Sequence, residues 1–204
     1  MSTARDRSTD QVFINCPFDP TFAPMFQAII FAVKFCGFTP RCAREFDDEF
    51  RMDKLFRIMG ECRYGIHDLS RTELDRQHGL PRFNMPFELG VFLGAKHFGD
   101  DEQRSKRTLI LDIEPYRYQK FLSDLNGMDP HSHGNDPAMA ASEVRTWLRN
   151  VSRRKLAGPV STAEAWRRFE ADLPAIARAA GCDPTDVPYA DYEAMVTDWL
   201  AAAR

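Results

Sequence analysis

The sequence predicts an α/β protein in which a doubly wound parallel sheet is followed by a C-terminal helical extension. Short apolar runs rich in β-branched residues alternate with helical patterns between residues 11 and 115. This order favours right-handed βαβ units and a parallel sheet. Beyond that point only helical patterns recur, so the strands are confined to the first part of the chain.

The individual elements follow from their apolar periodicity and from the residues that interrupt it. Pro17 and Pro20 end the first apolar run because proline cannot donate to a sheet ladder. Gly37 ends the first helical pattern. Strands are expected at residues 11–16, 38–43, 64–69 and 108–112, and helices at 22–35, 52–62 and 86–95.

Changes in composition along the chain predict three regions. Residues 1–10 are polar and expected to be disordered, 11–137 form the α/β core, and 138–204 form the helical extension. The core ends in a turn-rich stretch, 126–137, which reads as a long loop. Three helices follow, at 138–153, 161–180 and 189–203; the capping box Ser161–Glu164 opens the second. The extension is expected to pack on the core or to join a second subunit in a homo-oligomer.

Composition excludes several classes of function. The 204 residues include 27 Lys and Arg against 30 Asp and Glu, so the basic excess of nucleic-acid-binding proteins is missing. The longest apolar run, 28–33, is far shorter than the roughly 20 residues of a membrane span, and no apolar signal segment begins the chain. Five scattered cysteines suit reduced, buried thiols. We therefore expect a cytoplasmic protein that binds a small molecule, without nucleic-acid or membrane partners.

Polar side chains gather where the expected strands end, which is where open parallel sheets bind their ligands. Loops are polar by default, so no single member of this set is decisive. The set comprises Asn15, Pro17, Asp19, Arg44, Asp47, Asp68, Ser70, Arg71, Asn84, Glu88, Asp112 and Glu114. Their concentration at one edge is what indicates a site.

Glu88 stands out within this set because it interrupts an apolar helical stretch near the start of the helix. Backbone N–H groups in a first helical turn favour negative charge, so we expect this carboxylate to stay ionised. An ionised carboxylate suits a nucleophile, or a stabiliser of an oxocarbenium-like transition state in glycosidic cleavage. The simpler alternative is a Glu that only improves its helix dipole, by about 0.3–1 kcal/mol.

Other polar groups have a functional and a structural interpretation. His131 and His133 can ligate a metal with nearby acids, but their Gly/Asn/Asp/Pro-rich surroundings favour a surface loop and no metal. Tyr116 and Tyr118 suit base stacking or core packing equally. Cys16 ends the first strand, where a thiolate could act, but no His is close in sequence and a buried structural thiol is the default.

Two further patterns bear on phosphate binding. Arg51, Lys54 and Arg57 recur at helical spacing, which indicates a solvated helix face more readily than a phosphate site. The chain lacks a glycine-rich phosphate loop, which argues against a kinase, an NTPase or a dinucleotide-binding dehydrogenase.

Three short motifs together resemble the nucleoside 2-deoxyribosyltransferase and TIR-domain group. They are Asn-Cys-Pro-Phe-Asp at 15–19, Asp68 after the third strand, and Asn-Met-Pro-Phe-Glu-Leu-Gly at 84–90. The resemblance covers residues 11–115 and implies a flavodoxin-like core. It also implies cleavage or transfer of an N-glycosidic bond in a nucleoside, nucleotide or NAD, with Glu88 attacking or stabilising the anomeric carbon.

The same resemblance implies roles for other residues. Asp68 and Asn84 would contact the sugar or position Glu88, while Asn15 and Phe18 would lie in the loop after the first strand, where Phe18 stacks on the base. NAD enters as a substrate, and no cofactor is implied.

TIR relatives also include modules without turnover. A non-catalytic, nucleotide-sensing or assembly module therefore remains the alternative. A phosphoryl-accepting or flavin-binding domain, with Asp68 as the acceptor, is a third interpretation.

Overall fold

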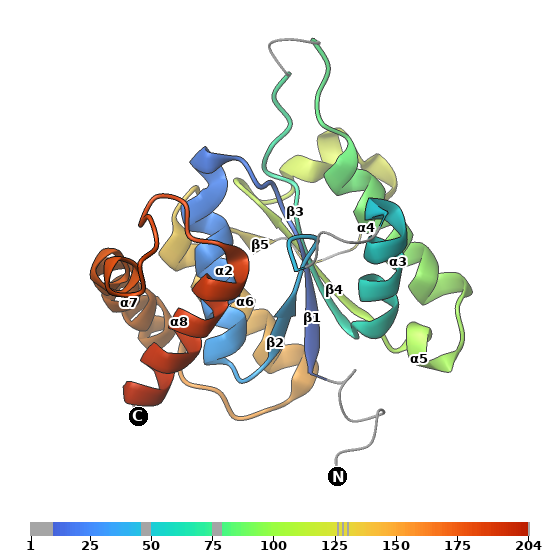
Figure 1. Ribbon diagram of the computed structural model, residues 1–204. Helices are drawn as coiled ribbons and strands as arrows, with labels where there is room; N and C mark the ends of the chain where they lie inside the picture. Colours follow the sequence, from blue (N-terminus) through green and yellow to red (C-terminus); the bar gives the residue numbers. More distant parts are fainter. Residues whose placement is uncertain are drawn as a thin grey trace.

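The computed structural model describes residues 10–45, 50–74, 79–125, 127, 129 and 131–203 (Figure 1). Within them, one sheet of parallel strands has the order β2-β1-β3-β4-β5. This is the strand order of the flavodoxin-like fold, so the predicted α/β class is confirmed. The strands are β1 (Gln11–Asn15), β2 (Thr39–Arg41), β3 (Tyr64–Asp68), β4 (Arg107–Asp112) and β5 (His131–Ser132).

The helices begin and end close to the expected positions, apart from several short elements that the periodicity does not reveal. The longer ones are α2 (Ala23–Phe35), α3 (Arg51–Glu61), α4 (Asn84–Phe98), α6 (Pro137–Ser152), α7 (Pro159–Ala179) and α8 (Tyr189–Ala202). The short ones are η1 (Pro20–Phe22), α5 (Asp101–Arg104), η2 (Arg117–Lys120) and η3 (Ser123–Leu125). The expected disordered segment, 1–10, falls outside the described residues except for Asp10.

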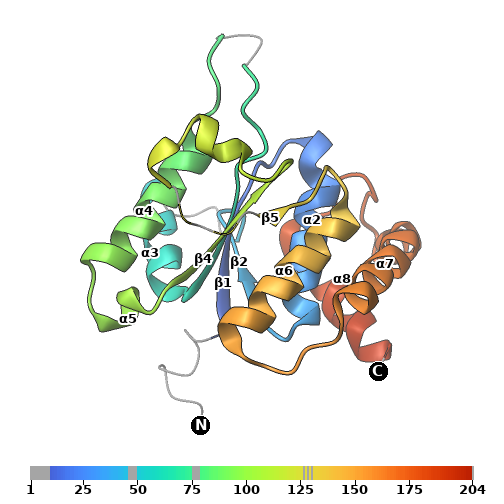
Figure 2. The ribbon, with the colours of Figure 1, turned by 180° about the vertical axis from the view of Figure 1, so that it is seen from behind.

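Helices cover both faces of the sheet. In Figures 1 and 2, α3, α4 and α5 lie on one side, while α2 and α6 lie on the other with α7 and α8 outside them. Successive residues of β1 supply the two layers, because side chains alternate across a strand. Val12 and Ile14 join the core beneath α2, whereas Phe13 packs with Leu55 of α3 and Phe92 of α4.

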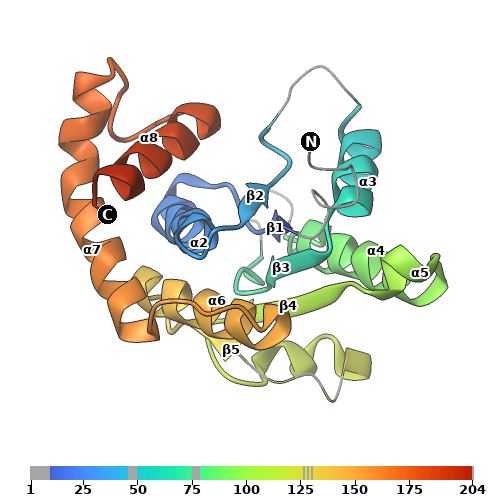
Figure 3. The ribbon, with the colours of Figure 1, turned by 90° about the horizontal axis from the view of Figure 1, so that it is seen from below.

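The C-terminal helices share the core of the sheet. Figure 3 shows α2 enclosed by the sheet, α6, α7 and α8. The ring of Phe31 in α2 contacts Trp166 and Phe169 of α7 and Trp199 of α8, with ring centroids 5.3–5.9 Å apart. One continuous apolar cluster contains residues from both sides of position 137. The domain boundary expected near residue 137 stays a prediction.

Two local expectations were wrong. The 126–137 stretch is not only a loop, since His131 and Ser132 form β5 beside Leu111 and Asp112 of β4. Ser161 does not cap α7, because the helix begins two residues earlier at Pro159, with Gly158 at its N-cap. A two-residue strand is too short to show periodicity, and the proline at the first helical position supplies an equally good start.

Candidate functional site

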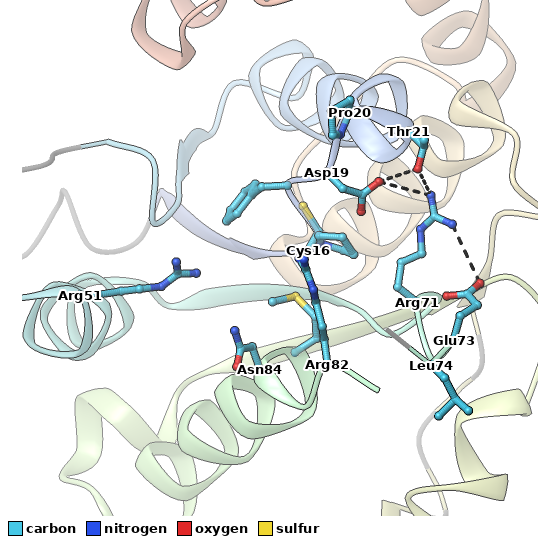
Figure 4. A pocket seen from close by; sticks show the side chains of 13 residues that line it. Cys16, Asp19, Pro20, Thr21, Arg51, Arg71, Glu73, Leu74, Arg82 and Asn84 are labelled. Atoms are coloured by element: carbon cyan, nitrogen blue, oxygen red, sulfur yellow. Dashed lines mark hydrogen bonds and ion pairs between the residues drawn. The ribbon is translucent and has the colours of Figure 1, made fainter. Parts of the chain in front are cut away.

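A cavity of about 870 Å³ opens at the carboxyl edge of the sheet. Its walls come from the loops after β1 and β3 and from the N-terminal ends of α3 and α4 (Figure 4). This is the position expected for a ligand site in an open parallel sheet. Of the sequence-predicted residues, five line the cavity: Pro17, Phe18, Asp19, Arg71 and Asn84.

The other predicted residues lie around this cavity and not on its wall. Asn15, Asp68, Ser70 and Glu88 are buried next to the strand ends. Arg44 is exposed outside the cavity, where its guanidinium lies 5.2 Å from the ring centroid of Phe18. Asp47 lies outside the described residues.

Asp68 is held by hydrogen bonds on both carboxylate oxygens and is inaccessible to solvent. Its Oδ1 accepts from the backbone N–H of Ser70 at 2.9 Å and from the Ser70 hydroxyl at 2.5 Å. Its Oδ2 lies 3.0 Å from Nε2 of buried His133. Because the Asn135 N–H donates to His133 Nδ1 at 3.1 Å, the ring hydrogen is on Nε2 and is donated to Asp68. This network fixes the end of β3 to the end of β5.

Asn15 connects the end of β1 to the start of α4. Its side-chain NH₂ donates to the carbonyl of Met85 at 2.9 Å and to Nδ1 of His67 at 3.0 Å. The Met85 carbonyl can only accept, so it fixes which way the Asn15 amide faces. Asn15 Oδ1 is buried with no hydrogen-bond partner among the described residues. Asn15 thus acts from behind the cavity wall, through the start of α4.

His67 is a core histidine. Burial lowers its pKa to about 3, so the ring is neutral. With Nδ1 accepting from Asn15, the ring hydrogen is on Nε2, which has no hydrogen-bond partner in the described part of the chain. The ring meets Phe92 edge-on, with centroids 5.1 Å apart. Gly65 makes room for this contact, since a Cβ there would lie 2.8 Å from His67 Nε2.

Glu88 occupies a less polar position than its sequence indicated. The helix α4 begins at Asn84, so Glu88 is its fifth residue and lies beyond the first turn. The side chain is 5% exposed, and burial raises its pKa to about 7, opposed by the charge of Arg51. The expectation of a permanently ionised carboxylate was therefore wrong: Glu88 titrates near neutral pH.

The position of Glu88 relative to the cavity follows from its electrostatic neighbours. Its charge interacts with Cys16 and with Arg51, and both of these residues line the cavity. Asn84, which also lines it, is one helical turn before Glu88 and so on the same face of α4. Glu88 is therefore close to the lining residues Cys16, Arg51 and Asn84 but is not itself part of the cavity wall.

Cys16 is a thiol and not a nucleophilic thiolate. Burial raises its pKa well above the usual value, and the negative charges of Asp68 and Glu88 add to this effect. A nucleophilic cysteine needs the opposite environment, with nearby positive charge and partial exposure.

Three arginines from separate elements reach the cavity (Figure 4). Arg51 is the first residue of α3, Arg71 follows β3, and Arg82 precedes α4. Arg71 donates to the hydroxyl of Thr21 at 2.6 Å and lies 3.6 Å from Asp19. Although partial burial opposes it, the Thr21 hydrogen bond and the Arg71 charge hold the pKa of Asp19 below its usual value.

The sequence placed Arg71 at a strand end but did not identify the cluster that it forms with Arg51 and Arg82. The spacing of Arg51, Lys54 and Arg57 indicated one solvated face, but Lys54 is buried and Arg51 faces the cavity. One sequence feature could have indicated that Arg51 faces the cavity: it lies at the start of a helix that follows a strand, and such helix starts lie at the carboxyl edge of a parallel sheet.

Arg117 fastens the loop after β3 to the end of β4. It donates to Asp112 Oδ1 at 2.7 Å, to the carbonyls of Leu69 and Ser70 at 3.0 and 2.8 Å, and to the Thr72 hydroxyl at 2.8 Å. Burial raises the pKa of Asp112, and the Arg117 bond opposes that rise. Arg117 thus positions the segment that carries Arg71.

The aromatic and histidine candidates divide between core and surface. Tyr118 is buried in the core, whereas Tyr116 is exposed and has a left-handed backbone, with φ 63°. His131 lies 2.7 Å from Glu143 of α6. In the described part of the chain, the His, Cys, Asp and Glu side chains form no group of three that could hold a metal ion.

A smaller cavity of about 300 Å³ adjoins the first one. Arg71, Arg82 and Met85 line both cavities. Apolar side chains supply most of the remaining wall, among them Leu69, Pro81, Phe83, Pro86 and Phe121.

Comparison with known proteins does not extend this description. The chain matches no family model, no curated protein and no solved structure. Among the helices of the described residues, none has the length and apolar character to cross a membrane. The class defined by the structure is therefore the fold itself, a flavodoxin-like domain with a charged cavity at its carboxyl edge.

Proposed function

We propose that this protein cleaves or transfers the N-glycosidic bond of a nucleoside, nucleotide or NAD in the cytoplasm, with Glu88 as the catalytic residue. The supporting observation is the environment of Glu88: a nearly buried carboxyl group close to residues that line a large cavity, with a pKa of about 7. Its carboxyl group forms no hydrogen bond or ion pair with the described residues. A carboxylate kept free and titrating near neutral pH is typical of catalytic sites.

The proposed chemistry requires the Glu88 carboxylate to reach the anomeric carbon of a ligand in the cavity. As the bond between C1 and the base breaks, positive charge develops on the ribosyl ring, and ionised Glu88 stabilises it or bonds to C1. Water or a second base then takes up the ribosyl group. Asn84, on the same face of α4, contacts the sugar, and Phe18 stacks on the base.

The buried polar residues act by positioning. Asp68 holds Ser70 and His133 in place and does not reach the cavity. Asn15 fixes the carbonyl of Met85 in the first turn of α4, three residues before Glu88. We assign both to maintaining the geometry of α4 and the β3 loop.

Release of a free base tests this proposal. The purified protein is incubated with NAD, NADP and a panel of ribo- and deoxyribonucleosides and their phosphates, and products are identified by mass spectrometry. The wild type should release a base, Glu88→Gln should not, and Glu164→Gln, an exposed substitution on α7, should behave as wild type. Equal release by wild type and Glu88→Gln would contradict the proposal.

A second candidate function is a nucleotide-binding or assembly module without turnover. It is favoured by the absence of Glu88 from the cavity wall, since the lining residues alone can then recognise a ligand. This alternative predicts measurable affinity by calorimetry and intact ligand after long incubation. A protein that releases a base would exclude it.

The third interpretation has no comparable support. A phosphoryl acceptor must be reachable by the donor, whereas Asp68 is 0% exposed and both of its oxygens are hydrogen-bonded.

A further inference from the structure

The two cavities at the carboxyl edge share a wall, and this wall is positively charged. Arg71 and Arg82 line both the larger and the smaller cavity. In a ligand that occupies both cavities, the part between the cavities would therefore lie next to the guanidinium groups of Arg71 and Arg82. Guanidinium groups match phosphate oxygens in charge and in geometry.

Among the described residues, Arg71 is paired with two acids, whereas Arg51 and Arg82 are not. Asp19 and Glu73 lie 3.6 and 3.9 Å from Arg71, within ion-pair distance, and all three side chains are partly exposed. Arg82 and Arg51 form no ion pair with any residue that the structure describes. The lining side chains that the structure describes thus include three arginines and two carboxylates, and Arg82 is left to pair with an anionic ligand.

The helix ends add to the same field. Arg51 opens α3 and Asn84 opens α4, and neither helix has a side chain that caps its N-terminus. Among the described residues, no N-cap side chain accepts from the first backbone N–H groups of either helix, and such groups favour negative charge.

The smaller cavity has a different chemistry on its far side. Beyond the arginines, its wall is made by Leu69, Phe83 and Phe121, with Phe83 and Phe121 partly exposed. A volume of about 300 Å³ is at the lower end of the range for small-molecule pockets. An apolar pocket with aromatic walls suits a flat ring system.

We propose that Arg71 and Arg82 bind a phosphate or diphosphate group that joins two parts of one ligand, a ribosyl part over Glu88 in the larger cavity and a flat ring system in the smaller cavity. The placement of the ribosyl part rests on the proposed function. The binding of the phosphate and of the ring system requires no bond cleavage and is tested separately.

Calorimetry with three probes tests this assignment: ADP-ribose, ribose 5-phosphate and adenosine. ADP-ribose has its diphosphate between a ribose and an adenosine, whereas ribose 5-phosphate has no ring system beyond its phosphate. We expect ADP-ribose to bind most tightly and adenosine most weakly. Arg82→Gln should weaken binding of both phosphate probes about tenfold or more, as expected for loss of a hydrogen bond to a charged group.

Two further variants separate the parts of the site. Arg104→Gln removes the same charge from α5, outside both cavities, and should leave all affinities unchanged. Phe121→Ser should weaken ADP-ribose severalfold and leave ribose 5-phosphate unchanged, because only ADP-ribose reaches the smaller cavity. The unchanged affinity for ribose 5-phosphate also shows that the Phe121→Ser variant is folded.

The assignment is overturned if ADP-ribose binds no more tightly than ribose 5-phosphate, or if Arg82→Gln or Phe121→Ser binds ADP-ribose as the wild type does. Its failure is distinct from failure of the proposed function. Binding that follows the expected pattern without any release of a base would remove the glycosidic reaction alone. Base release with a KM unaffected by Arg82→Gln would remove the phosphate assignment alone.

Discussion

Replacing Glu88 by glutamine should stabilise the protein, and the gain should depend on pH. Burial raises the pKa of Glu88 from 4.5 to about 7. At about 1.36 kcal/mol per pKa unit, the ionised carboxylate then costs the folded state about 3 kcal/mol. Below pH 4.5 both folded and unfolded chains hold the proton and this cost is absent; it grows as pH rises and is complete above about pH 8.

Urea unfolding of the wild type and Glu88→Gln at pH 5.0 and pH 8.5 measures this cost. The stability of Glu88→Gln relative to wild type should rise by about 2–3 kcal/mol between the two pH values. Any constant penalty for burying the glutamine amide cancels in this difference. Glu164→Gln, which changes an exposed carboxylate on α7, is the matched control and should show no such rise.

The result that refutes this reasoning is a difference between Glu88→Gln and wild type that is the same at both pH values. It would mean that Glu88 does not take up its proton more readily in the folded protein, so burial would not govern its charge. The proposal of a carboxylate maintained at the expense of stability would then lose its physical basis.

Three further predictions concern the charge of Glu88, the space around Gly65 and the ion pair of Arg117. If Glu88 acts in its ionised form, the rate of base release at low substrate concentration should rise with pH around 7 and level off above about pH 8; a falling profile would assign it as a general acid. Gly65→Ala should lower the free energy of unfolding by about 1–3 kcal/mol because its Cβ would lie 2.8 Å from the Phe92 ring, whereas Gly90→Ala, with nothing within 4 Å, should stabilise α4 slightly in the same urea assay. Arg117→Met should destabilise the protein by about 3 kcal/mol, measured in the same way, since it leaves a buried carboxylate without its ion-pair partner; an unchanged midpoint would show that this pair is dispensable.

The fold was predictable because strands and helices alternate along the chain, and each type of element has its own spacing of apolar residues. The runs at 11–16, 64–69 and 108–112 correspond to β1, β3 and β4, which are buried on both faces of the sheet. The strand β5 was missed because two residues are too few to show a periodicity. It forms by pairing with Leu111 and Asp112 of β4, and the spacing of residues in the sequence does not reveal this pairing.

The candidate site was predictable in location but less so in chemistry. The strand-end rule placed Asp19 and Asn84 at the cavity. It could not separate residues on the wall from those behind it, such as Asp68, because that distinction depends on the partner, His133, 65 positions away. The charge state of Glu88 was also inaccessible, since it depends on burial between helices and strands and not on neighbours in the sequence.

The enclosed position of α2 has a consequence for the order in which the chain is synthesised. Phe31 leaves the ribosome before its partners Trp166, Phe169 and Trp199, which belong to α7 and α8. At about 5–20 residues per second, the apolar outer face of α2 would wait on the order of ten seconds or more for its cover. During translation the face of α2 that carries Phe31 therefore stays without these contacts until α7 and α8 have emerged.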